Sequence, residues 1–449
     1  MRKFWIWILA LLMALTPVCA GAEAPETDAS ARAEAVCDAL VAGDYASVVE
    51  CFDENMAAQV SEEALAQGFQ SVMPFLGDYQ GRGTITEEAQ GDYRILVVEE
   101  RFANSNLEIQ LALDGEGRVA GLQMRPVAAE AADETQYGPW TEVELTVAAD
   151  PAYPLGATLC LPEGADVALP PVVLLVQGSG SSDRDETIFQ NRPFRDLAHG
   201  LAELGVASLR YDKRTFVYPE TAGESGTDID LRGEMLEDVN ACLDLLRADG
   251  RVDAERIFVL GHSLGGMMVP AIASENSDLA GAISMAGSLR PLWEIVYDQN
   301  QEIIQTARAG ELSEAGRAAL DAQVEQLEAD MAVLRGDFSG LSDDTPIMGI
   351  SARYWKSLRD YCGANFLDRI DLPLLVLQGE ADFQVSPEKD YALWQEALAG
   401  RENVQFCLYH GLNHLMMPTT GQRNTTDYVQ PAHVAQEVIA DIAAFVNGN

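Results

Sequence analysis

Basic residues are scarce in this sequence. Its 449 residues include 29 Lys and Arg against 71 Asp and Glu, which gives a formal net charge of −42. Binding to nucleic acid needs a basic stripe that neutralises phosphates, and no such stripe is visible. A nucleic-acid partner is therefore not expected, and the acidity is typical of the solvated surface of a soluble, exported protein.

Long apolar runs are also rare. One of them, residues 4–15, follows Arg2 and Lys3 and precedes a stretch of small residues. This arrangement predicts a secretory signal peptide over residues 1–22, since the run is too short and wrongly flanked for a helix that spans a membrane. No second run of comparable length follows, so we expect a secreted, extracytoplasmic protein with no membrane span.

Cysteine pairs of the C-x-x-C type are absent from the sequence, so a zinc site is not expected. Cys19 leaves lipid attachment open, although the Pro17-Val18 pair before it is a poor match to the small residues that lipoprotein processing prefers. Cys37 and Cys51 lie on two helices that the pattern predicts to be consecutive. A disulfide between them in an oxidising compartment and two free thiols fit the sequence equally well.

The length of the chain predicts two domains, because a single hydrophobic core rarely serves this many residues. Residues 28–128 begin with three helical patterns, over residues 31–45, 46–56 and 61–77, and continue with strand patterns. A small α+β domain, in which helices precede a curved antiparallel sheet, is therefore expected here. The polar and acidic residues 129–138 are predicted to be a linker.

Residues 139–449 show a different rhythm, in which apolar runs alternate with helical patterns. Two runs at the start predict an antiparallel pair, and the later runs are typical of a mostly parallel sheet covered by helices on both faces. A long insertion of helical character, residues 290–370, separates two of these strands. We expect it to lie as a lid over the carboxyl ends of the strands, where open α/β sheets bind ligands.

The stretch RIFVLGHSLGGMMVP, residues 256–270, places Ser263 between Gly261 and Gly265 in a G-x-S-x-G pattern. An apolar strand pattern precedes this serine and an apolar helical pattern follows it. The serine is therefore expected on a strand-to-helix elbow, where flanking glycines avoid the collisions of a Cβ. Because the N-terminus of the following helix favours negative charge, Ser263 is the candidate nucleophile. Pro270 is expected to kink that helix without breaking it.

A serine nucleophile needs a base, and the base needs an acid that orients it. His414 follows the last apolar strand, where a loop can carry it to the carboxyl end of the sheet, and His410 is its rival at the strand end. Asp382 lies just beyond the penultimate strand and is the candidate acid, with Glu380 as the runner-up. Each partner of Ser263 thus follows an apolar strand, as the geometry of a triad requires.

An oxyanion hole is expected from two backbone N–H groups. One belongs to Leu264, the residue after the candidate nucleophile. The second is expected from the loop that follows the apolar run ending at Val176, where Ser179 is the candidate and Gly178 lies beside it. Gly178 and Gly180 let this backbone turn sharply, and an ordinary glycine turn is the alternative interpretation.

Five short motifs occur between residues 139 and 447: QGSGSSDRDE at 177–186, RYDKR at 210–214, GHSLGG at 261–266, GEAD at 379–382 and GLNH at 411–414. Together they resemble the secreted bacterial esterases of the α/β-hydrolase superfamily. Thr215 departs from that pattern, which usually has a glycine after RYDKR, and this leaves the shape of the entrance loop open. The order of elements in residues 28–128 resembles the nuclear-transport-factor-2-like (NTF2-like) domains that precede some bacterial hydrolases.

Two groups of side chains have two interpretations each. Charged residues in the motifs form a salt-bridged scaffold beneath the oxyanion loop, which we favour, or they contact the substrate. These residues are Asp183, Arg184, Asp185 and Asp212. Aromatic residues of the insertion line the substrate pocket or form the core of the lid. These residues are Trp293, Tyr297, Tyr354 and Trp355.

The sequence therefore predicts a serine hydrolase that cleaves small-molecule carboxylic esters through an acyl-enzyme, with no metal and no organic cofactor. A peptidase or an acyltransferase on the same triad is the first alternative, because the fold hosts many chemistries. A non-catalytic binding protein with a vestigial hydrolase domain is the second. The N-terminal domain is expected to be a binding or dimerising module, which leaves open a homodimer formed through it.

Overall fold

The computed structural model describes residues 29–90, 93–103, 106–127, 139–163, 169–222, 229–309, 314–338 and 340–448. The chain forms two compact units, one from the described residues up to Val127 and one from nearly all of those from Pro139 onwards. The predicted signal peptide, Cys19 and the predicted linker lie outside the described residues. Among the helices that the structure describes, none has the length and apolar character that crossing a bilayer requires.

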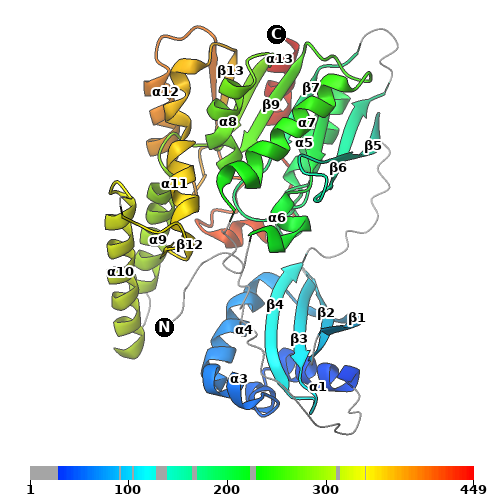
Figure 1. Cartoon of the computed structure of the whole chain (residues 1–449), viewed down its shortest axis with the longest axis vertical. Helices are drawn as coiled ribbons and strands as arrows, with labels where there is room; N and C mark the ends of the chain where they lie inside the picture. Colours follow the sequence, from blue (N-terminus) through cyan, green and yellow to red (C-terminus); the bar gives the residue numbers. More distant parts are fainter. Residues whose placement is uncertain are drawn as a thin grey trace. The chain divides into compact units, whose positions relative to one another are not determined.

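The N-terminal unit packs helices against an antiparallel sheet with the strand order β1-β2-β3-β4 (Figure 1). Its elements are α1 (Ala29–Ala42), α2 (Tyr45–Val49), α3 (Glu54–Gln59), α4 (Glu62–Leu76), β1 (Tyr79–Gln90), β2 (Tyr93–Phe102), β3 (Asn106–Leu113) and β4 (Val119–Val127). The single helix predicted over residues 46–56 is wrong. Asp53 accepts a hydrogen bond from the backbone N–H of Met56 and so begins a new helix, α3, because aspartate is a strong N-cap.

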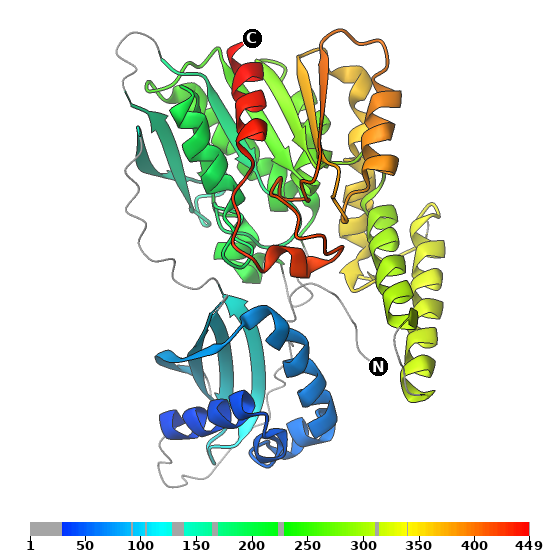
Figure 2. The ribbon, with the colours of Figure 1, turned by 180° about the vertical axis from the view of Figure 1, so that it is seen from behind.

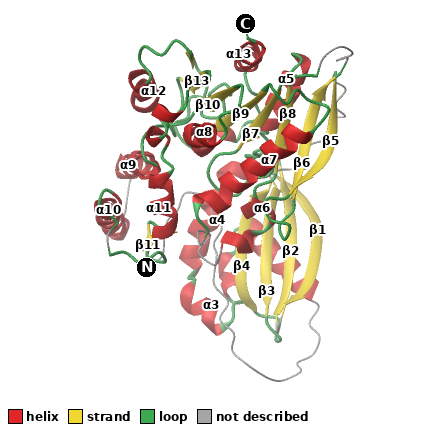
Figure 3. Cartoon of the chain, turned by 45° about the horizontal axis from the view of Figure 1, so that its top comes forward, coloured by secondary structure: helices red, strands yellow, loops and turns green. Residues whose placement is uncertain are grey.

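The C-terminal unit is built on a sheet whose order, among the described strands, is β14-β13-β10-β9-β7-β8-β6-β5 (Figure 3). The strands are β5 (Trp140–Val147), β6 (Leu155–Pro162), β7 (Val172–Val176), β8 (Ala207–Tyr211), β9 (Ile257–His262), β10 (Gly281–Met285), β13 (Leu374–Gly379) and β14 (Val404–Tyr409). The predicted antiparallel pair is β5 and β6, and within this sheet the strands from β7 onwards pair in parallel with one another. Every residue of the five strands β7, β8, β9, β10 and β13 is buried, as expected for strands covered on both faces.

Helices cover both faces of this sheet. Figure 1 shows α7 and α8 in front of the strands, and Figure 2 shows α13 on the opposite side. There α13 packs closely against α5, since a Cβ at Gly200 would lie 2.7 Å from Ile439 Cδ1. The helices are α5 (Pro193–Glu203), α6 (Arg214–Val217), η1 (Pro219–Ala222), η2 (Arg232–Leu236), α7 (Glu237–Ala248), α8 (Leu264–Glu275), η5 (Pro387–Tyr391), α12 (Ala392–Ala397), η6 (Thr425–Tyr428) and α13 (Gln436–Asn447).

The order of the strands creates a topological switch point. From β7 the chain moves outwards to β8, and it then returns to β9 on the other side of β7. Loops that leave the carboxyl ends of β7 and β9 therefore diverge, which is where α/β sheets form a ligand crevice. The candidate oxyanion loop follows β7 and the candidate nucleophile follows β9, so both lie at this point.

The insertion between β10 and β13 is mostly helical, as predicted. It contains α9 (Leu292–Ala309), α10 (Glu314–Leu334), β11 (Pro346–Ile347), β12 (Ile350–Ser351), α11 (Ala352–Asp360), η3 (Gly363–Asn365) and η4 (Leu367–Arg369). Figures 1 and 2 show α9 and α10 side by side at one side of the sheet. Arg290 at the start of the insertion binds Asp390, which is fully buried after β13, through Nε and Nη2 at 2.7 and 2.8 Å. This bidentate pair fixes the root of the insertion to the segment that also carries the candidate acid.

Candidate active site

Ser263 occupies a strained elbow between β9 and α8. Its backbone has φ 54° and ψ −115°, a region that residues other than glycine rarely adopt. A Cβ at Gly261 would lie 2.2 Å from the carbonyl oxygen of Gly265, and a Cβ at Gly265 would lie 2.4 Å from that of Val176. Both positions therefore require glycine, and the G-x-S-x-G pattern has the structural context that the sequence predicts.

Helix α8 runs from Leu264 to Glu275 through Pro270, so the proline does not break it. Because proline has no N–H, the carbonyl of Gly266 loses its usual partner one turn later. The hydroxyl of Ser284 on β10 donates to that carbonyl instead, at 3.1 Å. Helix α8 is thus bound to the neighbouring strand β10 at the point where Pro270 interrupts the helix's own backbone hydrogen bonds.

The structure separates the two candidate histidines. His414 Nδ1 lies 2.7 Å from Asp382 Oδ2, and both side chains are buried. His410 pairs with Glu380 instead, and its side chain is 96% exposed. Since an orienting acid must hold the base in a site that excludes water, the buried pair has the arrangement of a catalytic His-Asp pair and the exposed pair has that of a surface contact.

The carboxylate of Asp382 is fixed by several donors besides His414. Its Oδ1 accepts the backbone N–H groups of Gln384 at 2.8 Å and Val385 at 2.9 Å. Its Oδ2 also accepts Gln378 Nε2 at 2.8 Å. Such hydrogen bonds fix the direction in which the carboxylate presents Oδ2 to the imidazole.

His262 joins the elbow to the loop that carries His414. Its Nε2 lies 2.9 Å from the carbonyl oxygen of His414, and its Nδ1 lies 2.9 Å from Glu186 Oε2. Burial lowers the pKa of His262, but the negative charge of Glu186 and the contact with His414 outweigh it, so that the pKa is raised. The sequence did not predict this pairing, although Glu186 stands at the end of the first motif.

The loop after β7 corrects one expectation. The N–H of Gly178 donates to Glu186 Oε1 at 2.6 Å, so Gly178 is not available as an oxyanion donor. Glycine at this position lets the loop pass close to the serine, because a Cβ at Gly178 would lie 3.1 Å from the Cβ of Ser263. The N–H groups of Ser179 and Leu264 make no hydrogen bond within the described part of the chain, and both adjoin the serine elbow.

The charged motif residues bind one another. Arg184 Nη2 lies 2.7 Å from Asp212 Oδ2, and Arg210 pairs with Asp185. Asp183 accepts the N–H and the hydroxyl of Thr187 at 2.9 and 2.6 Å. These contacts are those of a salt-bridged scaffold that fixes the loop between β7 and α5.

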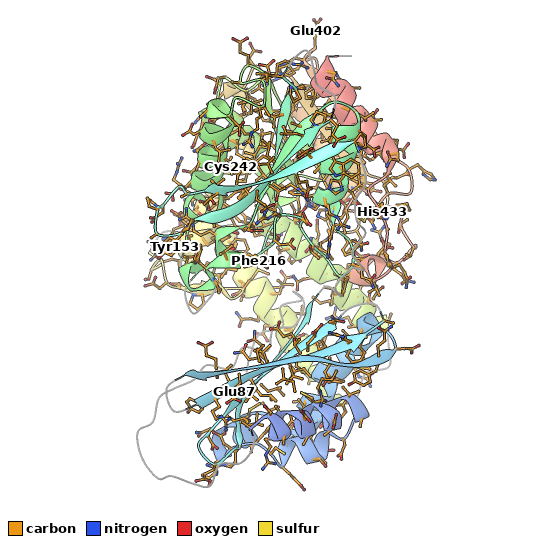
Figure 4. All side chains as sticks on the ribbon, turned by 90° about the vertical axis from the view of Figure 1, so that its right-hand side faces the viewer. Glu87, Tyr153, Phe216, Cys242, Glu402 and His433 are labelled. Atoms are coloured by element: carbon orange, nitrogen blue, oxygen red, sulfur yellow. The ribbon has the colours of Figure 1, made fainter. Side chains whose placement is uncertain are left out.

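Thr215, which stands where the related esterases usually have glycine, lies on the short helix α6 and is buried. Its carbonyl oxygen accepts the hydroxyl of Ser181 at 3.1 Å. Phe216, which is labelled in Figure 4, is 48% exposed. The departure from glycine thus adds a buried side chain next to the oxyanion loop, and an exposed aromatic residue follows it.

The four aromatic residues singled out in the insertion have partners within the insertion or on η2. Trp293 and Trp355 pack edge to face with ring centroids 6.3 Å apart, and Trp355 Nε1 donates to the carbonyl of Ile347. Tyr297 donates to Glu328 on α10 at 2.8 Å. These three side chains therefore contact other residues of the insertion. Tyr354 is buried and its hydroxyl donates to Glu234 on η2.

Away from this site, three side chains of the kinds that bind metal ions lie close together. Ligand atoms of Glu142, Cys160 and His199 lie within 4.8 Å of one another. Burial raises the pKa of Cys160 to about 12, and Glu142 already pairs with Arg210. A protonated thiol and a carboxylate paired with arginine are poor metal ligands. The six described cysteines are all free, Cys37 and Cys51 among them.

Parallel strands, a strained serine elbow after β9 and a buried His-Asp pair after β13 and β14 define an α/β-hydrolase. Residues 191–419 match the family described as serine aminopeptidase, S33, and the chain belongs to this family. Esterase EstD of Thermotoga maritima is 31% identical over 410 residues, which cover 91% of this chain and 92% of that protein. Residues 33–122 match a family described as a protein of unknown function, DUF3887.

Two solved structures are similar to the chain at low identity. Est1E from Butyrivibrio proteoclasticus is 18% identical with a TM-score of 0.42, and the match covers 68% of this chain and 99% of that chain. A puromycin-hydrolysing peptidase of Mycobacterium tuberculosis is 17% identical with a TM-score of 0.44. That match covers 82% of this chain and 47% of the peptidase.

Proposed function

We propose that the protein is a serine esterase that hydrolyses carboxylic esters through an acyl-enzyme on Ser263. The observation that carries the proposal is the buried pair of His414 and Asp382 beside the strained serine elbow. Similarity to an esterase over nine-tenths of the chain supports the same substrate class. In this proposal, Ser263, His414 and Asp382 carry out the reaction.

In the first half of the reaction, Ser263 Oγ attacks the ester carbonyl and His414 takes the hydroxyl proton. Asp382 accepts a hydrogen bond from Nδ1–H of His414, which leaves the other ring nitrogen free to accept that proton. The N–H groups of Ser179 and Leu264 stabilise the oxyanion, together with the positive end of the α8 dipole. His414 then returns the proton to the departing alcohol. In the second half, water repeats the sequence on the acyl-enzyme and releases the acid.

The proposal also covers where the protein acts and what its N-terminal unit does. Residues 1–22 direct export and are removed, so that the esterase acts outside the cytoplasm. The N-terminal unit is an NTF2-like module that binds a partner or dimerises, and it carries none of the proposed catalytic residues. Helices followed by an antiparallel sheet support this assignment.

A peptidase is the second candidate, because the family that matches residues 191–419 is described as serine aminopeptidase. The same serine, base and acid cleave amides when the leaving amine is protonated by the histidine. The two activities are separated by assaying one acyl group as its aryl ester and as its anilide. An esterase turns over the ester far faster, whereas an aminopeptidase requires a free α-amino group on the acyl part.

The test of the proposed function is Ser263→Ala. We expect kcat for an aryl ester to fall by about 10⁶-fold, as for other catalytic serines, and labelling by a fluorophosphonate probe to disappear. Exposed His410 provides the matched control, and His410→Ala should keep both activity and labelling. Residual turnover in Ser263→Ala, or a labelled peptide that lacks Ser263, would exclude the assignment.

A further inference from the structure

A buried lysine holds the oxyanion loop from behind. Lys213 follows β8 and is 1% exposed. Its ammonium group donates to the carbonyl of Gly178 at 2.9 Å, to that of Gly180 at 2.8 Å and to Glu234 Oε1 at 2.8 Å. An ammonium group has three N–H donors, and all three are used here.

These contacts set the direction of the Ser179 N–H. The carbonyl of Gly178 and the N–H of Ser179 belong to the same peptide group, and in a trans peptide the two point in opposite directions. Because the carbonyl points at Lys213, the N–H points away from it, out of the buried side of the loop. A cation on the carbonyl oxygen also polarises the peptide group and strengthens its N–H as a donor. The N–H of Gly178 is held by Glu186, so the peptides on both sides of this residue are fixed.

The lysine is in turn connected to the insertion. Glu234, which is also buried, accepts Lys213 through Oε1 and the hydroxyl of Tyr354 through Oε2. Glu234 lies on η2, a short π-helix, and Tyr354 lies on α11 of the insertion. Burial and the negative charge of Glu234 raise the pKa of Tyr354 well above its usual value, so the tyrosine stays a neutral donor.

Helix α11 is fixed on the same segment by a second contact. The backbone N–H of Leu231 donates to the hydroxyl of Ser357, one turn beyond Tyr354, at 3.0 Å. Two side chains from one face of α11 thus bind the segment 231–234. The position of this helix and the position of the Lys213 ammonium are therefore coupled through a single carboxylate.

We propose that Lys213, Glu234 and Tyr354 are positioning residues that hold the Ser179 N–H in the oxyanion hole, and that helix α11 of the insertion thereby controls the rate of the chemical step. The inference rests on the proposed function. It assigns to Tyr354 a role in oxyanion stabilisation, where the sequence left open whether this residue lines the pocket or belongs to the lid core. The insertion then acts on the chemistry through the oxyanion loop and not only through the shape of a pocket.

The experiment compares Tyr354→Phe with Tyr297→Phe. Each change removes one tyrosine hydroxyl of the insertion that donates to a glutamate, but only Tyr354 is connected to the oxyanion loop. Because Tyr354 acts on the oxyanion loop only through Glu234 and Lys213, the loss of its hydrogen bond should reach the reaction in part and reduce kcat of Tyr354→Phe by about 3- to 10-fold, with KM nearly unchanged. Tyr297→Phe should match the wild-type protein. Rates are expressed per active site titrated with a fluorophosphonate, which removes any contribution from misfolded protein.

A second readout separates positioning from general structure. An aryl trifluoromethyl ketone forms a tetrahedral oxyanion adduct with the serine, whereas the matching methyl ketone binds as the ground state. For Tyr354→Phe the Ki of the trifluoromethyl ketone should rise in parallel with the loss of kcat, and the Kd of the methyl ketone should stay within about twofold, since only the oxyanion contact changes. Equal weakening of both ligands would assign Tyr354 to the binding pocket and overturn the proposal.

Lys213→Met should have the larger effect, a fall in kcat of about 100-fold, which is the loss seen when one oxyanion donor is removed. Because this change leaves Glu234 without a counter-charge in the interior, the double variant Lys213→Met/Glu234→Gln is measured beside it. Titrated sites with wild-type kcat in either variant would overturn the proposal. If the wild-type protein is neither labelled by the fluorophosphonate nor active on esters, the proposed function fails. If the wild-type protein is active and Tyr354→Phe behaves as Tyr297→Phe, only this inference fails.

Discussion

Two histidine–carboxylate pairs lie close together in the sequence and differ in their surroundings. His414 and Asp382 are buried, whereas His410 and Glu380 are exposed. An amide in place of the orienting carboxylate presents the wrong hydrogen-bond partner to Nδ1 of the imidazole and favours its wrong tautomer. Such a change in a comparable triad lowers kcat by about 10⁴-fold.

We therefore expect Asp382→Asn to lower kcat for an aryl ester by about 10⁴-fold. Glu380→Gln is the matched control, and its effect should be small because solvent surrounds that contact. Steady-state rates with one activated ester measure both variants. Mild and equal losses in the two would mean that neither carboxylate orients the base.

His262 adds a pH dependence to the stability of the site. The titratable and polar groups that face it include Glu186, Asp382 and both the carbonyl and the imidazole of His414, whose ring centroid lies 4.7 Å from that of His262. Since its pKa in the folded protein is raised above the usual value of about 6.5, the folded state binds the proton more tightly than the unfolded state. The stabilisation is fully present below the unfolded pKa and is lost as the pH rises through the raised folded pKa.

Glu186→Gln tests this linkage, because the amide oxygen can still accept the N–H of Gly178 while the negative charge is gone. The free energy of unfolding should fall by about 3–5 kcal/mol at a pH of about 6, the usual cost of breaking a buried pair. The difference in unfolding free energy between this variant and the wild-type protein should become smaller as the pH rises through the pKa of His262, because the imidazole then loses its charge. Denaturant titrations across the pH range give the comparison, and a constant difference would contradict a charged His262.

At the scale of elements, the strands were predictable and several connections were not. The runs of β7, β9 and β13 are apolar almost without interruption, which is what burial on both faces produces. The elbow was predictable because its glycines are required by local collisions. The Lys213–Glu234 pair was not, since its two partners lie on different elements and their pairing is decided by tertiary packing.

Helix α8 and strand β10 are joined by the hydrogen bond from the Ser284 hydroxyl to the carbonyl of Gly266. Ser284→Ala removes the hydroxyl that serves the carbonyl left free by Pro270, and an unsatisfied buried carbonyl costs about 1–3 kcal/mol. In the Pro270→Ala background the new N–H can serve that carbonyl, so the same change should cost less. A double-mutant cycle of unfolding free energies measures the coupling between the two sites. Additive effects would show that the hydroxyl does not replace the missing N–H.

At the scale of the whole molecule, the change of pattern near residue 139 predicted the two units that the structure contains. Each unit has its own hydrophobic core. The core of the N-terminal unit includes Leu96 and Ile109, and that of the C-terminal unit includes Leu174 and Leu243. Because each core is closed within its own unit, the two units are expected to unfold as separate cooperative blocks.

Because the two units have separate cores, a core substitution in one unit should change the thermal unfolding of that unit alone. Ile109→Ala removes a fully buried side chain from the N-terminal core, and Leu243→Ala does the same on α7 of the C-terminal unit. Each change should destabilise its own unit by about 2–5 kcal/mol. Calorimetry should therefore show two transitions, of which each variant lowers a different one. Fluorophosphonate labelling of Ser263 should be lost with the transition that Leu243→Ala lowers and should be unaffected by Ile109→Ala. A single transition that both variants lower together would mean that the two units unfold as one block, and the N-terminal unit would then contribute directly to the stability of the active site.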